Sequence, residues 1–187
     1  MKRSCKEERI TSLRIAKKAV DSRKKDNVFF VYNVYAEVDS DEAAIIAHSR
    51  NSKVEAYTEY KYVMPSVRRK STLRPVIAGF GPAGFFAALT LARSGLRPIV
   101  LERGADVDTR TQKVNVFWTQ RKLDTESNVQ FGEGGAGTFS DGKLTTGIKD
   151  PLCRKVVDEL IAHGAPEEIG YSSRPHIGTD RLGAVVK

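Results

Sequence analysis

Residues 79–84 read Gly-Phe-Gly-Pro-Ala-Gly and satisfy the spacing G-x-G-x-x-G. In this pattern the first glycine permits a tight turn, the second lets a charged group approach the backbone, and the third lets a helix pack close to a strand. Amide groups at the start of that helix then face the charged group, and the helix dipole favours negative charge there. The pattern therefore predicts a site for nucleotide phosphates. A β-branched residue at Gly81 would fill the phosphate space and obstruct the turn.

An acidic residue stands where a dinucleotide site needs one. Glu102 lies 18 residues beyond Gly84 and directly follows an apolar run, Ile-Val-Leu. An acid at the end of the second strand binds the ribose hydroxyls of a dinucleotide. A triphosphate-binding P-loop would need lysine and serine or threonine after the last glycine, but Phe85 and Phe86 follow here. The ligand expected is therefore a dinucleotide.

These residues require a strand–turn–helix–strand unit to position them. We expect a short buried strand over 76–78, a helix over 82–94 that Gly95 closes, and a second strand over 98–101. The helix repeats apolar residues around one face: Phe85, Phe86, Leu89 and Leu91. The fold class predicted for this part is α/β, with an incomplete Rossmann-like βαβ unit that binds FAD or NAD(P).

The chain after Glu102 is polar up to residue 129, and no helix or strand is assigned to it. A glycine-dense stretch follows, which contains Gly134, Gly135 and Gly137. Such a backbone can lie against a flat or multiply charged ligand, although an ordinary loop has the same composition. Helices are expected over 152–163, before Gly164, and from a Thr179-Asp180 cap to the last residue.

The N-terminal part predicts a separate, small α+β module over residues 1–64. The run over 28–38 is rich in β-branched and aromatic residues and predicts a strand, which pairs as a hairpin with residues 11–21. A helix over 42–49, capped by Ser40 or Asp41, and a second strand over 54–63 should follow. Two prolines bracket a polar, basic linker over 65–75, so the nucleotide-binding part spans 76–187.

The charge distribution separates the same two parts. The net charge is +8, and residues 1–74 carry 17 Lys and Arg against 10 Asp and Glu, whereas the rest carry 14 against 13. Two cysteines, Cys5 and Cys153, form no disulfide or zinc pattern and indicate a reducing compartment. There is no apolar run of membrane-spanning length and no secretory signal. We therefore expect a cytoplasmic protein with no membrane partner.

Three segments of the chain resemble a family of FAD-dependent oxidoreductases (dehydrogenases) of the glutathione-reductase type. They are RPVIAGFGPAGFFAALTLARSGLRPIVLERG, ESNVQFGEGGAGTFSDGKLTT and GAPEEI with PHIGTDRL. The Gly-Pro-Ala-Gly variant of the motif favours FAD over NAD. The resemblance implies a flavoenzyme with a small-molecule substrate and NAD(P)H as an electron donor. Family members are much longer, so the resemblance also implies that this chain is an N-terminal piece.

The resemblance also assigns cofactor-binding residues. The complete set expected to contact FAD is Gly79, Gly81, Pro82, Ala83, Gly84, Glu102, Arg103, Gly134, Gly135, Ala136, Gly137 and Thr138. Within it, residues 134–138 should lie near the pyrophosphate and the isoalloxazine ring. His176 and Lys143 could act near the flavin, although an ordinary loop histidine and a solvated turn lysine are the favoured explanations. No catalytic acid or base and no metal ligand is assigned.

Two alternatives stay open at this stage. The same motif fits an NAD(P)-binding oxidoreductase, because spacing alone does not separate the two cofactors. The basic residues 17, 18 and 23–25 stand beside the aromatic residues 29, 30 and 32, as in modules that bind single-stranded nucleic acid. In that reading the nucleotide-binding half would be vestigial. No named nucleic-acid signature accompanies the cluster, and a solvated basic face has the same composition. We therefore do not expect nucleic acid to be the partner.

Overall fold

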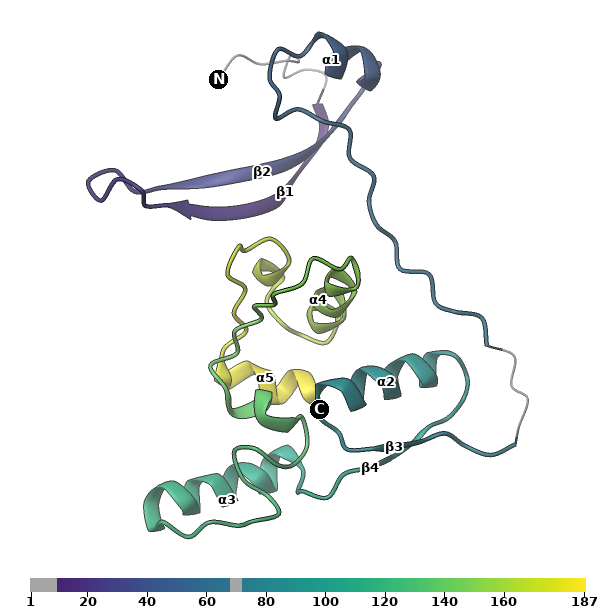
Figure 1. The fold of residues 1–187 in the computed structure, drawn as a ribbon, viewed down its shortest axis with the longest axis vertical. Helices are drawn as coiled ribbons and strands as arrows, with labels where there is room; N and C mark the ends of the chain where they lie inside the picture. Colours follow the sequence, from purple (N-terminus) through teal and green to yellow (C-terminus); the bar gives the residue numbers. More distant parts are fainter. Residues whose placement is uncertain (1–9, 68–71) are drawn as a thin grey trace. The chain divides into compact units, whose positions relative to one another are not determined.

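The computed structural model describes residues 10–67 and 72–187, and its secondary structure is mixed α/β with small two-stranded sheets (Figure 1). The chain divides into two compact units. The first comprises the chain up to Lys61 together with Gly170–Arg174, and the second comprises Tyr62–Ile169 and Pro175–Lys187.

The first unit is built on a long antiparallel hairpin of β1 (Ile10–Asp21) and β2 (Phe29–Val38), which Figure 1 shows in purple and blue. The strand and the hairpin expected from the sequence are therefore confirmed. Helix α1 (Glu42–His48) follows, and the Asp41 carboxylate caps it by accepting a hydrogen bond from the Ala44 N–H at 3.1 Å. Asp41 is thus the cap among the two residues expected.

The edge of β1 binds a segment from far along the chain. The Lys18 N–H donates to the Tyr171 carbonyl at 2.7 Å, and the Ser173 N–H donates to the Lys18 carbonyl at 2.9 Å. These two bonds form an isolated parallel bridge between Lys18 and Ser172. The first unit is therefore discontinuous in sequence.

The strand expected over residues 54–63 is wrong, because this segment joins neither sheet of the described structure. Tyr57 stacks on Tyr35 of β2 with ring centroids 4.0 Å apart, whereas Tyr62 and Met64 line a pocket of the second unit. β-prone residues form a strand only where a neighbouring strand offers hydrogen bonds. Here the segment packs through its side chains instead.

The second unit begins with a parallel βαβ element. Strands β3 (Val76–Ala78) and β4 (Ile99–Leu101) pair in parallel, and α2 (Pro82–Arg93) connects them. Ser94 is the C-cap of α2 and Gly95 follows with φ +75°, so the helix ends where the glycine predicted. Both strands and the helix are confirmed.

The expectation that β3 is buried is wrong. Val76 is 61% exposed, and Leu101 on β4 is 58% exposed. A parallel strand is buried when both faces of its sheet are covered and strands flank it on both sides. In the described structure the sheet has only two strands, so it offers each of them a single neighbour.

Three further α-helices lie in the described part of the second unit. Helices α4 (Leu152–Ala162) and α5 (Thr179–Val186) confirm the two expected, although the N-cap of α5 is Gly178 and not the Thr179-Asp180 pair. Helix α3 (Val107–Gln120) occupies the polar stretch where no element was expected. The sequence reasoning missed this helix because the buried face of α3 includes an arginine, which apolar periodicity does not reveal.

The core of the second unit lies away from the sheet. The buried cluster comprises Leu160, Ala165, Ile169, Ile177 and Leu182. Phe86 of α2 packs against this cluster and links the βαβ element to it. The apolar face expected for α2 is therefore only half-buried, since no residue of that helix is fully buried.

Part of the expected linker, residues 68–71, lies outside the described residues, and so does Cys5. At the end of that linker the Arg74 guanidinium donates to the carbonyls of Arg97 at 2.7 Å and Pro98 at 3.1 Å. Among the described residues, no helix has both the length and the apolar character needed to cross a membrane.

Candidate dinucleotide-binding site

The turn between β3 and α2 carries the first glycine motif. Gly79 has φ +91°, which residues with side chains rarely adopt, and its N–H donates to the Leu101 carbonyl at 2.7 Å. Gly81 is the N-cap of α2, and no side chain caps the helix there. Pro82 occupies the first helical turn, as the sequence predicts. The helix therefore starts with backbone donors that no side chain engages.

The third glycine of the motif is required by packing. A Cβ built on Gly84 would lie 2.1 Å from the Gly79 carbonyl oxygen, a distance that real Cβ atoms do not show. Gly81 is different, because its φ of −78° suits any residue and its Cβ would meet only the Gly135 Cα, at 3.9 Å. A Cβ alone at Gly81 therefore leaves the turn unobstructed, and obstruction by a β-branched side chain stays a prediction.

Glu102 ties the end of β4 to the glycine turn. Its Oε2 accepts a hydrogen bond from the Phe80 N–H at 2.7 Å, and its Oε1 accepts one from the Gly104 N–H at 2.8 Å. Each carboxylate oxygen has a second lone pair, so the side chain can still accept a hydroxyl proton. Arg103 is engaged elsewhere, at 3.0 Å from Glu126 and over the Phe131 ring at 5.5 Å.

The second glycine stretch lies against the first. The Gly134 N–H donates to the Phe80 carbonyl at 2.8 Å. A Cβ on Gly135 would lie 3.1 Å from both the Gly81 Cα and the Pro82 Cδ. The structure thus brings together two stretches that are far apart in the sequence, and their closest approach is backbone to backbone.

The rest of the second stretch forms a short 3-10 helix, η2 (Gly135–Phe139). Ala136 is exposed, and a Cβ on Gly137 would meet nothing within 4 Å. Thr138 is buried, and its hydroxyl donates to the Glu133 carbonyl at 3.2 Å. Thr138 therefore stabilises the stretch through a buried hydrogen bond, whereas Ala136 and Gly137 face open space.

A fully buried arginine, which the sequence reasoning missed, supports the second stretch. Arg110 of α3 is 0% exposed. Its guanidinium donates to the carbonyls of Asn128 at 2.7 Å, Val129 at 2.9 Å and Glu133 at 2.6 Å, and it lies over the Phe139 ring at 4.7 Å. Burial lowers the pKa of Arg110, and the negative charge of Glu102 opposes that shift.

Glu133 connects α3 to the same stretch. Its carboxylate accepts a hydrogen bond from the Val107 N–H at 2.8 Å, and its own N–H donates to the Ala105 carbonyl at 3.0 Å. The Ala105 N–H in turn donates to the hydroxyl of Ser127, which is 1% exposed.

A signal for α3 was present in the sequence, because Asp106 precedes a helix and caps it.

The remaining candidates lie elsewhere in the second unit. Lys143 pairs with Asp141 at 2.6 Å, and its backbone forms an isolated antiparallel bridge with His176. Both side chains are exposed. His163 lies with its Nδ1 2.7 Å from the Glu159 carbonyl, a contact typical of a histidine at a helix end. Cys153 is half-buried in α4.

No protein-family model matches the chain. A relative, an uncharacterized protein of Clostridium beijerinckii (strain ATCC 51743 / NCIMB 8052), is 52% identical over 182 residues, which are 96% of this chain and 34% of the relative. The chain therefore spans about a third of the length of that relative.

Proposed function

We propose that the glycine-lined surface of the second unit binds FAD and that the chain serves a flavin-dependent oxidoreductase. The observation that carries the proposal is the contact of Gly135 with Gly81 and Pro82. It places glycine backbone, with the Pro82 ring beside it, at the start of a helix whose N-terminus has no side-chain cap. A pyrophosphate needs such a surface, because its oxygens must approach backbone amides closely.

The residues present fit this group. The N–H groups of Ala83 and Gly84 are in the first turn of α2 and would donate to the pyrophosphate oxygens. Glu102 would accept from the ribose hydroxyls with its remaining lone pairs. FAD would supply the redox chemistry, and the chain would supply binding and orientation. An NAD(P) site is the rival proposal, and NAD(P)H is the electron donor that we propose for the flavin enzyme.

Substitutions at Gly81 test the site with little disturbance of the fold. We expect Gly81→Ala to weaken FAD binding and Gly81→Val to abolish it, because the added carbons occupy the space of the pyrophosphate. The measurement is FAD titration of the 187-residue chain, followed by flavin absorbance after removal of free ligand. Gly147→Ala is the matched control, because its Cβ would meet nothing within 4 Å and it lies outside the site.

Circular dichroism of each variant establishes that the fold is retained. Undiminished flavin uptake by a folded Gly81→Val variant would contradict the assignment. Uptake of NAD(H) without FAD by the unaltered chain would favour the rival cofactor.

Glu102→Ala should lower FAD affinity about ten- to a hundredfold, because charge-assisted hydrogen bonds contribute roughly 1.5–3 kcal/mol. The same change removes the acceptor of the Phe80 N–H, so exchange of that amide with solvent should accelerate. The two readouts, by FAD titration and by hydrogen exchange, separate ribose binding from support of the turn. Faster exchange with unchanged affinity would show that Glu102 only supports the turn.

A further inference from the structure

A second concave feature of the second unit lies at the C-terminal half of α2, separate from the glycine-lined surface. It is a pocket of about 250 Å³ between α2, α4 and the segment that carries Tyr62 and Met64. Most of its wall is apolar and consists of Tyr62, Met64, Phe86, Leu89, Leu152 and Val156. The volume is below the roughly 300 Å³ at which sites for drug-sized ligands begin, so a smaller molecule fits.

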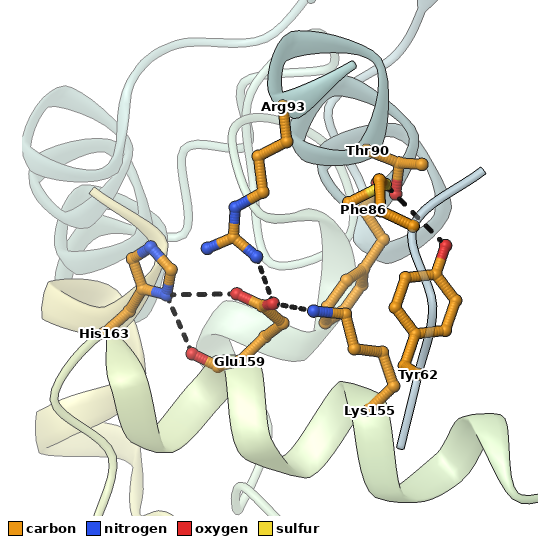
Figure 2. Close-up of polar contacts among 8 residues, drawn as sticks. Tyr62, Phe86, Thr90, Arg93, Lys155, Glu159 and His163 are labelled. Carbon is orange, nitrogen blue, oxygen red and sulfur yellow. Dashed lines mark hydrogen bonds and ion pairs between the residues drawn. The ribbon is translucent and has the colours of Figure 1, made fainter. Parts of the chain in front are cut away.

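Thr90 and three charged side chains complete the lining, and Figure 2 shows the charged side chains converging. The Glu159 side chain is 7% exposed, and its Oε1 accepts hydrogen bonds from both Arg93 and Lys155 (Figure 2). Its other oxygen, Oε2, lies 3.9 Å from the His163 Nδ1 and has no hydrogen-bond partner. Burial raises the pKa of Glu159, but hydrogen bonds from Arg93 and Lys155 and their charges outweigh burial and lower the pKa below its usual range.

The cluster contains more positive charge than one carboxylate neutralises. Glu159 contributes one negative charge, and Arg93 and Lys155 contribute two positive charges. A guanidinium has five N–H donors and an ammonium has three, so both groups can donate further. The Arg93 side chain is 40% exposed, and the Lys155 Nζ lies 5.0 Å from the centre of the Tyr62 ring, at the pocket wall. The pocket therefore combines an apolar wall with a net positive end.

We propose that this pocket binds a small amphipathic carboxylate. The apolar body lies between Phe86 and Leu89 of α2 and Val156 of α4, and the carboxylate accepts hydrogen bonds from Arg93 and Lys155. Charge complementarity selects the class of ligand, because an amine of the same shape would be repelled by the surplus positive charge. A neutral molecule would gain only the apolar contacts.

Octanoate, octanol and octylamine test the proposal, because they share one apolar chain and differ in charge. Each is titrated into the 187-residue chain below its aggregation concentration, and calorimetry measures affinity. Octanoate should bind on the order of tenfold more tightly than octanol, as expected for a charge-assisted hydrogen bond, and octylamine should bind most weakly. Lys155→Met and Arg93→Met should each reduce octanoate affinity toward that of octanol.

Two further variants serve as controls. Leu89→Trp fills the pocket and should abolish binding of both octanoate and octanol. Arg154→Met removes a cation of the same helix that pairs with Asp158 at 2.8 Å outside the pocket, and it should change neither affinity. Circular dichroism identifies variants that fold, and Lys155→Met decides the charge question if Arg93→Met does not fold. Equal affinity for octanoate and octanol, or octanoate binding that survives Leu89→Trp, would overturn the proposal.

Discussion

Arg110 brings a positive charge into the interior of the second unit and directs its donors to backbone carbonyls. Its bonds to Asn128, Val129 and Glu133 hold three points of the chain just before the second glycine stretch. A guanidinium has a planar, fixed arrangement of donors, so it determines the geometry of the carbonyls that it binds. Arg110 therefore positions the stretch, although we assign it no contact with a ligand.

Arg110→Met should lower the free energy of unfolding by about 3 kcal/mol or more, because buried carbonyls lose their donors and each unsatisfied group costs roughly 1–3 kcal/mol. Urea denaturation of the variant measures the change. Lys113→Met is the control on the same helix, since Lys113 pairs with Asp124 at 2.8 Å with both side chains more than a third exposed. Such an exposed pair contributes at most about 1 kcal/mol. Equal losses in the two variants would contradict a special role for Arg110.

Two glycines of one motif differ in what they require. Gly84 has no room for a Cβ because the Gly79 carbonyl lies against it, so its role is packing. Gly81 has room and an ordinary φ, so the structure itself does not require glycine there. If glycine is required at position 81, the requirement therefore comes from a bound ligand and not from the fold. The proposed FAD titrations of Gly81 variants test this.

Helix α3 is capped at its first turn by a side chain. The Asp106 carboxylate accepts hydrogen bonds from the N–H groups of Asp108 and Thr109, both at 3.0 Å. The hydrogen bond from Thr109 is the main cause that lowers the pKa of Asp106 below its usual value. The cap positions Arg110, which begins the next turn. Because Arg110 holds the second glycine stretch, the start of α3 also helps to position that stretch.

The cap predicts a specific pH dependence. A carboxylate with a lowered pKa in the folded state stabilises that state above its unfolded pKa, about 4, and this contribution is lost as the pH falls through the lower, folded pKa. Asp106→Asn keeps a capping oxygen but cannot titrate. Thermal unfolding between pH 6 and about pH 2 should therefore show a smaller acid loss in Asp106→Asn than in the unaltered chain.

Asp106→Ala lacks the capping oxygen at every pH and should be less stable than Asp106→Asn throughout the same range. Parallel acid losses in the unaltered chain and in Asp106→Asn would refute the assignment of this titration to the cap.

The chain runs from the first unit into the second and contributes one late segment, Gly170–Arg174, to the first unit. Residues 171–173 follow α4 in sequence, yet they pair with β1 through two backbone hydrogen bonds to Lys18. A long-range pairing of this kind closes a large loop and forms only when its two ends meet. The first unit therefore depends on residues from late in the sequence.

Ser173→Pro tests this pairing, because proline has no N–H to donate to the Lys18 carbonyl. The neighbouring bond from the Lys18 N–H to Tyr171 should weaken, and exchange of the Lys18 amide with solvent should accelerate about fivefold, as expected for loss of one hydrogen bond. Hydrogen exchange followed by NMR measures the rate. Arg174→Ala is the control and should leave it unchanged, as should amides within the β1–β2 ladder.

Elements with local signals can be predicted from the residues alone. The turn glycines, Pro82 and the apolar runs around them specify β3, α2 and β4, and the β-branched and aromatic run specifies β2. In each case the pattern is formed by residues that are only a few positions apart in the sequence. The glycine motif and Glu102 could be recognised for the same reason, because strand, turn and helix follow directly along the chain.

Burial, long-range pairing and the assembly of the candidate site depend on how the folded chain packs. Strand β3 is exposed and residues 54–63 form no strand. Both outcomes depend on which neighbouring strands and covering elements the folded chain places beside these segments. The buried Arg110 and the contact of Gly135 with Gly81 join segments distant in sequence. No short pattern encodes such contacts, since a backbone carbonyl that accepts from Arg110 is chemically the same in every residue.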